Sequence, residues 1–314
     1  MKAEMVQRFL EQVITEKEPI REIRIRIGKP VFVLDSEGEK ILNFDEKSGN
    51  PELLRIEDEK ENSGIENGSM ADSELIRTLM EIFARHSLYA YEREISQGFL
   101  TIRGGHRIGI TGKAVVESGH VKTVRDISSL NIRIAHEIKG CAKSVLPHLL
   151  SGEEFLDTLV ISPPGAGKTT LLRDLIRELS SGGSWGSGKN VSVVDERSEI
   201  AACFGGVAQC DLGPRTDVMD GCPKSEGMLM MLRSMAPQVL AVDEITAPED
   251  LRAIQEAAGC GVTLLATAHG GSWEELRLRP LYRELLDQGI FRTFVVLSLA
   301  QGKRVYTVRK EGMP

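Results

Sequence analysis

The stretch Ser162-Pro-Pro-Gly165-Ala-Gly167-Lys168-Thr169-Thr170 decides the fold of this chain. It follows the apolar residues 159–161 and opens a segment whose apolar residues recur at helical spacing. A strand, a glycine-rich loop and a helix in this order are typical of P-loop nucleotide-binding proteins. A chance glycine-rich helix start is the alternative, but the Gly-Lys-Thr-Thr sequence in this context argues against it. The usual first glycine of the loop is here Ser162, another small residue.

The chemistry of such a loop assigns a role to each kind of residue in it. Glycines let backbone N–H groups approach phosphate oxygens, and the helix N-terminus adds partial positive charge. Lys168 would reach the β- and γ-phosphates of ATP, and the hydroxyl of Thr169 would bind Mg²⁺. The residues expected to bind the nucleotide are Ser162, Pro163, Pro164, Gly165, Ala166, Gly167, Lys168, Thr169 and Thr170.

Two acids, Asp243 and Glu244, end the apolar run of residues 239–242. An apolar strand that ends in Asp-Glu downstream of a P-loop is a Walker B pattern. Asp243 would hold Mg²⁺ through water, and Glu244 would polarise the attacking water. Taken alone, the pattern would fit two solvated acids at a strand end equally well.

Two further strand ends carry polar residues. Asp195 and Glu196 end one apolar run in the segment 193–199, and His269 ends another in Thr267-Ala-His269-Gly270. Ligands of parallel sheets bind at the carboxyl ends of the strands. A second carboxylate there can orient water or metal, and His269 can sense the γ-phosphate. The alternatives are an ordinary polar strand end and a structural histidine.

Hydrophobic patterning divides the chain into two domains, 1–140 and 141–314. The second contains nearly continuous apolar runs that alternate with helical segments, which predicts an α/β domain with a mostly parallel sheet. These runs are residues 157–162, 191–195, 239–243, 262–268 and 293–299. Residues 180–189 are expected to form a flexible loop.

The first domain is predicted to be a smaller α+β domain. We expect helices around residues 5–13 and 75–83, and strands at 23–27 and 31–34. Short strands over residues 99–134 should be broken by the glycines, namely Gly104, Gly105, Gly109, Gly112 and Gly119. Residues 57–74 contain seven acids and one lysine and are expected to be a mobile loop.

Composition narrows the class of protein. Five cysteines, with no zinc-binding spacing, indicate buried small hydrophobes in a reducing compartment. With no signal-peptide core and no apolar run long enough to span a membrane, we expect a soluble intracellular protein. The formal net charge is −7, yet residues 101–143 contain eight lysines and arginines against three acids. That basic stretch needs a function.

Together these motifs resemble the stage III sporulation protein AA family of endospore-forming bacteria. The resemblance covers nearly the whole chain outside the acidic segment and the termini. The stretches that carry it are residues 22–30, 104–115, 124–142, 162–177, 193–202, 231–245 and 267–270. That family is in turn similar to the hexameric ATPases of type II and type IV secretion and of pilus assembly. Those have a RecA-like P-loop core after a smaller N-terminal domain.

The resemblance implies a Mg²⁺-dependent ATPase that forms a homo-oligomer, a hexamer by analogy with the secretion ATPases. It would lie in the cytoplasm at the mother-cell face of the forespore membrane, held there by membrane proteins of a sporulation channel and not inserted itself. Arg125 and Arg133 resemble N-domain arginines that complete a neighbour's active site. Arg103, Arg107 and Arg215 are further candidates, and each of these five arginines could instead be structural or merely solvated.

The resemblance leaves the catalytic base open between Glu196 and Glu244. Many secretion ATPases have Gly-Glu where this chain has Asp243-Glu244, and we favour Glu244. Three other functions remain alternatives: a RecA-like nucleic-acid motor, a non-enzymatic scaffold that binds nucleotide structurally, and a P-loop kinase. The basic stretch would suit nucleic acid, but its nearest aromatic residues, Tyr89, Tyr91 and Phe99, do not suggest a stacking platform, so nucleic acid is not the expected partner.

Overall fold

The computed structural model describes residues 2–16, 20–44, 51–55, 70–84, 91–300 and 303–310. The chain divides into two compact units, Met1–His136 and Glu137–Pro314. We call them the N-terminal and C-terminal units. The division lies four residues before the boundary expected from the sequence at residue 140.

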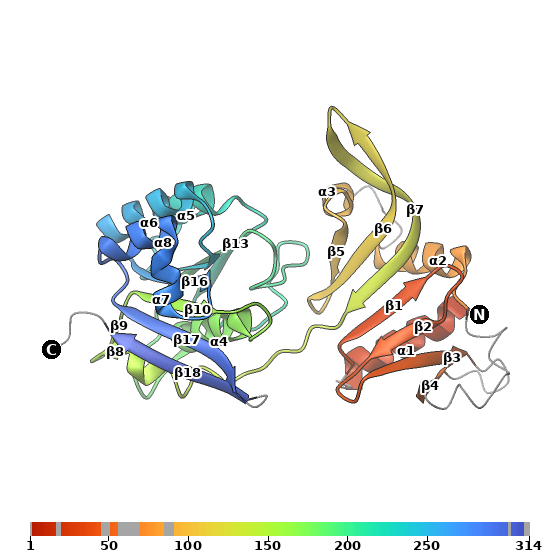
Figure 1. The fold of residues 1–314 in the computed structure, drawn as a ribbon, viewed down its shortest axis with the longest axis horizontal. Helices are drawn as coiled ribbons and strands as arrows, with labels where there is room; N and C mark the ends of the chain where they lie inside the picture. The colour runs from red at the N-terminus through yellow and green to blue at the C-terminus, as the bar shows by residue number, and fades with distance from the viewer. Residues whose placement is uncertain are drawn as a thin grey trace. The chain divides into compact units, whose positions relative to one another are not determined.

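The N-terminal unit contains one antiparallel sheet with the strand order β4-β3-β2-β1-β7-β6-β5 (Figure 1). The strands are β1 (Glu22–Arg26), β2 (Val31–Leu34), β3 (Glu39–Phe44), β4 (Pro51–Arg55), β5 (Phe99–Ile102), β6 (His106–Glu117) and β7 (His120–Arg133). The helices are α1 (Lys2–Glu16), α2 (Ser73–Phe83) and α3 (Glu92–Ser96). Alternate strand residues such as Ile23 and Ile25 are fully buried and share one core with α1 and α2. The alternating apolar residues of the strands and the apolar faces of the helices therefore pack together in this core.

The start of α2 corrects the expected acidic loop. Met70 forms a β-bridge with Pro30, and the Asp72 carboxylate accepts a hydrogen bond of 2.8 Å from Leu75 N. Asp72 is thus the N-cap of α2, a role for which aspartate is strongly preferred. The expectation of a mobile loop was therefore wrong for residues 70–74, and residues 57–69 lie outside the described part of the chain.

The β6–β7 hairpin corrects the expectation of short strands. Gly104 and Gly105 form a turn and Gly119 lies at the hairpin tip, but β6 continues through Gly109 and Gly112. At Gly112 the pairing register shifts by two residues, from Thr111 opposite Ser129 to Lys113 opposite Arg125, and a Cβ on Gly112 would lie 2.5 Å from the Arg125 carbonyl oxygen. Glycine here permits a β-bulge and does not end the strand.

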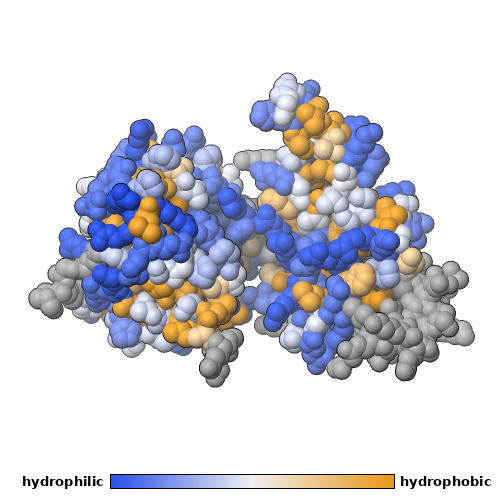
Figure 2. Space-filling view, in the orientation of Figure 1, coloured by the Kyte–Doolittle hydropathy of each residue, from blue (hydrophilic) through white to orange (hydrophobic). Residues whose placement is uncertain are grey.

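The distal half of this hairpin is a two-stranded ribbon. Among the described strands, residues 113–125 pair only within the hairpin, whereas β1 and β5 pair with its proximal half. Val116 and Val121 are 61% and 45% exposed there, and Figure 2 shows hydrophobic side chains along this ribbon.

The C-terminal unit is built on a second sheet with the strand order β14-β13-β15-β16-β10-β17-β18. All neighbouring pairs are parallel except β17 and β18. The strands are β10 (Thr158–Ser162), β13 (Val191–Asp195), β14 (Thr216–Asp220), β15 (Val239–Glu244), β16 (Thr263–His269), β17 (Thr293–Ala300) and β18 (Lys303–Lys310). The five expected strands form its centre. The edge strands β14 and β18 were missed because their half-exposed residues lack a continuous apolar run.

Helices cover both faces of this sheet. Val160 and Leu265 pack with α4 (Lys168–Ser181), whereas Leu159 and Leu264 pack on the other face. That second face is covered by α5 (Lys224–Met235), α6 (Pro248–Gly259), α7 (Trp273–Leu278) and α8 (Pro280–Asp287). Burial on both faces explains why the central strands read as continuous apolar runs.

The segment 180–189 is not a simple loop. Helix α4 continues to Ser181 and is followed by a small hairpin of β11 (Gly182–Gly183) and β12 (Gly186–Ser187). A Cβ on Gly182 would lie 2.4 Å from the backbone nitrogen of Gly188. The glycines therefore permit a close backbone approach. A second small hairpin joins β8 (Leu150–Ser151) and β9 (Glu154–Phe155) after a 3₁₀ turn, Leu146–Leu149.

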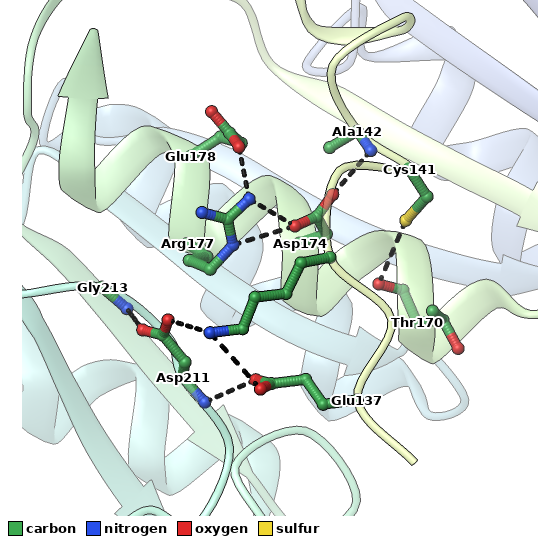
Figure 3. A network of polar contacts seen from close by, with 10 residues as sticks. Glu137, Cys141, Ala142, Thr170, Asp174, Arg177, Glu178, Asp211 and Gly213 are labelled. Atoms are coloured by element: carbon green, nitrogen blue, oxygen red, sulfur yellow. Dashed lines mark hydrogen bonds and ion pairs between the residues drawn. The ribbon is translucent and has the colours of Figure 1, made fainter.

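The segment that begins the C-terminal unit is anchored on α4 by a polar network (Figure 3). The buried carboxylate of Asp174 accepts a 2.7 Å hydrogen bond from Ala142 N and two hydrogen bonds from Arg177. Lys139, nearer the surface, pairs with Asp211 and with Glu137. Residues 137–142 are thereby held against the helix that begins at the P-loop.

Two expectations from composition can be compared with the described residues. All five cysteines are free, but only Cys203 is buried and Cys260 is exposed, so their interpretation as buried hydrophobes was wrong in general. None of the helices within the described ranges has both the length and the apolar character required to cross a membrane.

Candidate nucleotide-binding site

A cavity of about 400 Å³ lies at the carboxyl end of β10, the strand that enters the P-loop. Its lining comes from five separate parts of the C-terminal unit. These are residues 163–165 and 167–170 of the P-loop, Arg197 and Glu199 after β13, Asp243 and Glu244 of β15, His269 of β16, and Arg304 of β18. The carboxyl ends of neighbouring parallel strands thus converge on one pocket, as in other α/β folds.

The backbone of the P-loop depends on its glycines. Gly165 has a φ of +76°, and Gly167, the N-cap of α4, has a φ of +104°. These left-handed conformations are inexpensive only for glycine. Two of the nine predicted loop residues, Ser162 and Ala166, are buried and do not belong to the cavity lining. These two residues pack inside the protein beneath the loop backbone and do not face the cavity.

Lysine, glutamate and histidine meet in this cavity. The amine of Lys168 lies 3.6 Å from Glu244 Oε2 and 3.9 Å from Asp243 Oδ1. His269 Nε2 lies 2.8 Å from the same Glu244 oxygen, and the Thr267 hydroxyl donates to Asp243 Oδ1 at 3.1 Å. A register shift between β15 and β16, after Ala241, brings these strand ends together.

His269 is aligned with the P-loop by the sheet itself. It pairs in register with Ser162, and the next residue, Gly270, donates its N–H to the Ser162 carbonyl at 3.2 Å. The His269 ring is partly exposed and lines the cavity, while its Nδ1 atom is buried and has no hydrogen-bond partner among the residues that the structure describes. Nε2 is thus the ring nitrogen that meets the acidic cluster.

Asp195 does not act as a second open carboxylate. It is buried and accepts hydrogen bonds from the backbone nitrogens of Glu199, Ile200 and Ala201 at 2.8, 2.9 and 2.8 Å. Burial raises its pKa to about 6, although these hydrogen bonds oppose the shift. Of the two acids expected on the nucleotide side, Asp195 does not line the cavity, and its side chain instead shapes the loop that carries Arg197 and Glu199 there.

Glu196 faces a small neighbouring cavity that also contacts Asp243 and Glu244. Its carboxylate lies 3.4 Å from the amine of Lys224, a residue that the sequence reasoning missed. Lys224 is buried at the first position of α5, where it also donates to the Glu244 carbonyl and lies 3.8 Å from Asp250. A lysine at a helix N-terminus opposes the helix dipole, and this was the available signal that carboxylates must lie nearby.

The arginines differ in what they contact. Arg215 donates to the Ser180 carbonyl at 2.9 Å, at the amino end of β14, and is therefore at the opposite end of the strands from the P-loop. Arg107 stacks on Phe99, with 3.7 Å from its Cζ to the ring centroid. Arg103, Arg125 and Arg133 are exposed residues of the N-terminal unit, and Arg125 and Arg133 are both on β7.

The donor set of the cavity fits Mg²⁺ held mainly by phosphates and water. The cavity lining includes the Thr169 hydroxyl and the Asp243 carboxylate, and Mg²⁺ commonly uses one or two protein carboxylates together with substrate phosphates. No group of three or more acidic, histidine or cysteine side chains in the described ranges is arranged to bind a metal by itself.

The model of the family described as sporulation stage III, protein AA matches residues 1–309. This chain belongs to that family. Stage III sporulation protein AA of Bacillus subtilis (strain 168) is 41% identical over 283 residues, which cover 90% of this chain and 84% of that protein. The family predicted from the sequence motifs is confirmed.

Solved structures confirm the predicted fold class. The ATPase DotB of Legionella pneumophila aligns with a TM-score of 0.58 and 17% identity, over 98% of this chain and 80% of that chain. The pilus retraction motor PilT, solved with bound ADP, aligns with a TM-score of 0.60 and 15% identity, over 96% and 83%. At these identities the likeness shows the fold alone, a P-loop α/β core after a smaller domain.

Proposed function

We propose that this protein is a Mg²⁺-dependent ATPase. The observation that carries the proposal is the convergence of Lys168, Glu244 and His269 on one cavity at the P-loop. The backbone N–H groups of residues 165–168 would hold the β-phosphate, and Lys168 would bridge the β- and γ-phosphates. Bound Mg²⁺, held by Thr169 and Asp243, would neutralise charge that develops on the phosphates.

Glu244 is the better candidate for the catalytic base. It lines the cavity beside Lys168, whereas Glu196 lies in the adjoining space and is paired with Lys224. When ATP binds, Lys168 would pair with the phosphates instead of with Glu244. The Glu244 carboxylate would then keep its contact with His269 and could accept a proton from water. His269, which touches both Glu244 and the cavity, would register loss of the γ-phosphate.

The higher-order function follows from the family. We propose a homo-oligomeric ring, a hexamer by analogy, in which Arg125 and Arg133 complete a neighbouring subunit's site. We further place it in the cytoplasm, at the mother-cell face of the forespore membrane, bound to membrane proteins of a channel that it energises. The support is the B. subtilis relative, which is named as a sporulation protein, together with folds shared with proteins named as an ATPase and a pilus retraction motor.

The two glutamates can be separated by matched substitutions. Glu244→Gln removes the base but keeps the shape of the site, so phosphate release should fall by a factor of about 10²–10⁴ while ADP binding persists. Glu196→Gln should lower phosphate release by less than about tenfold. If Glu196→Gln abolishes hydrolysis and Glu244→Gln does not, the assignment of the base is wrong. If the wild-type protein binds neither ADP nor ATP, the proposed function is wrong.

A further inference from the structure

Arg304 approaches the P-loop from outside every nucleotide-binding motif of the sequence. It lies on the edge strand β18 and lines the same cavity as Lys168 and Thr169. Its Nε atom donates to the Ala166 carbonyl at 3.2 Å. A long cationic side chain from the far edge of the sheet is thus placed on the loop backbone.

The contact with the loop depends on glycine. A Cβ on Gly167 would lie 2.7, 2.8 and 2.9 Å from Arg304 Nε, Cζ and Nη2. The guanidinium therefore rests against the backbone at Gly167, in space that any other residue type would fill. This is the part of a P-loop whose backbone N–H groups donate hydrogen bonds to phosphate oxygens.

The positive charge of Arg304 is not neutralised by an ion pair in the described ranges. Ala166 O is the acceptor recorded for its guanidinium, and no described carboxylate forms an ion pair with it. A guanidinium has five N–H donors in a fork that matches phosphate geometry. Most of those donors are free to meet an anion in the cavity.

The strand order gives the side of the cavity from which Arg304 acts. Strand β10 lies between β16 and β17, so Glu244 and His269 approach from one side and Arg304 from the other. Water that attacks the γ-phosphate must lie near the base, and the β-phosphate is the leaving side of the reaction. Arg304 is therefore placed for the leaving diphosphate and not for the attacking water.

We infer that Arg304 is a binding residue for the β-phosphate of ADP and ATP. The inference rests on the proposed function, because it requires a nucleotide in this cavity. A contact that is present with both ADP and ATP stabilises the bound ground state and the transition state equally. Its loss therefore raises KM and leaves kcat unchanged. Arg304 is thereby distinguished from Glu244, whose removal lowers kcat.

The test uses the full-length protein and equilibrium titration with fluorescent analogues of ADP, ATP and AMP. Arg304→Ala should lower the affinities for ADP and for ATP by the same factor, about tenfold. This factor is the low end of the loss expected for an exposed charge-assisted contact. The affinity for AMP, which has no β-phosphate, should fall by less than about twofold in the same variant. Arg304→Lys should restore part of the loss, because the charge remains and the fork does not.

Arg309→Ala is the matched control. Arg309 is on the same strand but lies over the Trp273 ring and pairs with Glu274, so nucleotide affinity should not change. Unchanged ADP affinity in Arg304→Ala, an equal loss for AMP, or a fall in kcat with unchanged affinity would overturn the inference. Wild-type protein that binds no ADP would instead refute the proposed function, so the two failures are distinguishable.

Discussion

Asp174 gives the sharpest prediction about stability. Asp174 is 2% exposed, and its carboxylate connects the segment 137–142 to the P-loop helix α4 by accepting from Ala142 N. The same carboxylate accepts from Arg177, one turn further along α4. Burial disfavours its charged form, but the Ala142 N–H and the Arg177 guanidinium outweigh this effect and hold its pKa below the usual 3.8. The network is therefore stabilising in the charged form.

Asp174→Asn keeps the size of the side chain and removes its charge. It weakens one charge-assisted hydrogen bond from the backbone and a two-pronged contact with Arg177, each worth about 1.5–3 kcal/mol and not additive. We expect a loss of about 3 kcal/mol in the free energy of unfolding of the C-terminal unit, or about 6–12 °C in Tm. Both tryptophans, Trp185 and Trp273, lie in this unit, so their fluorescence reports its unfolding selectively.

The pH dependence provides a second check on the same residue. Because the folded-state pKa of Asp174 is lowered, its contribution is complete above the unfolded value near 3.8 and is lost as the pH falls through the folded value. The difference between wild type and Asp174→Asn should be constant from about pH 5 to 8 and shrink below about pH 4. Asp211→Asn, at an exposed aspartate of the same network, should cost less than about 1 kcal/mol. Equal losses for the two variants would refute the reasoning.

Two further predictions concern the site and its assembly. Lys224→Met should lower the free energy of unfolding by about 2 kcal/mol and reduce phosphate release, because Glu196 and the Glu244 carbonyl lose their cation. Thermal unfolding and a phosphate-release assay on one preparation test this, and an unchanged rate of phosphate release would contradict it. Arg125→Ala or Arg133→Ala should lower kcat by up to about 10³-fold in the assembled ring with nucleotide affinity unchanged; full activity of both variants, measured with the mass of the particle, would exclude them as residues that act on a neighbour.

Much of the C-terminal unit was predictable because its physical signals are local. The P-loop glycines, the continuous apolar strands and the apolar face of α4 each follow from neighbouring residues. The meeting of Lys168, Glu244 and His269 was also predictable, since carboxyl ends of parallel strands share one edge.

The residues that sequence reasoning missed depend on distant parts of the chain. Arg304 lies on an edge strand with no apolar run, and its place beside Gly167 follows only from the sheet order. Lys224 reaches carboxylates on two other segments. The strand through Gly112 was misjudged because a single glycine in the sequence can mark either a β-bulge within a strand or the end of the strand.

The most direct test of the proposed ATPase site is phosphate release from Mg²⁺·ATP by wild type and Lys168→Ala. Both proteins would be assayed over a range of concentrations, with particle mass and thermal unfolding measured on the same samples. We predict that wild type hydrolyses ATP with a specific activity that rises as a ring forms, and that Lys168→Ala stays folded and releases no phosphate. Hydrolysis that persists in Lys168→Ala, or none in an assembled wild-type ring, would contradict it.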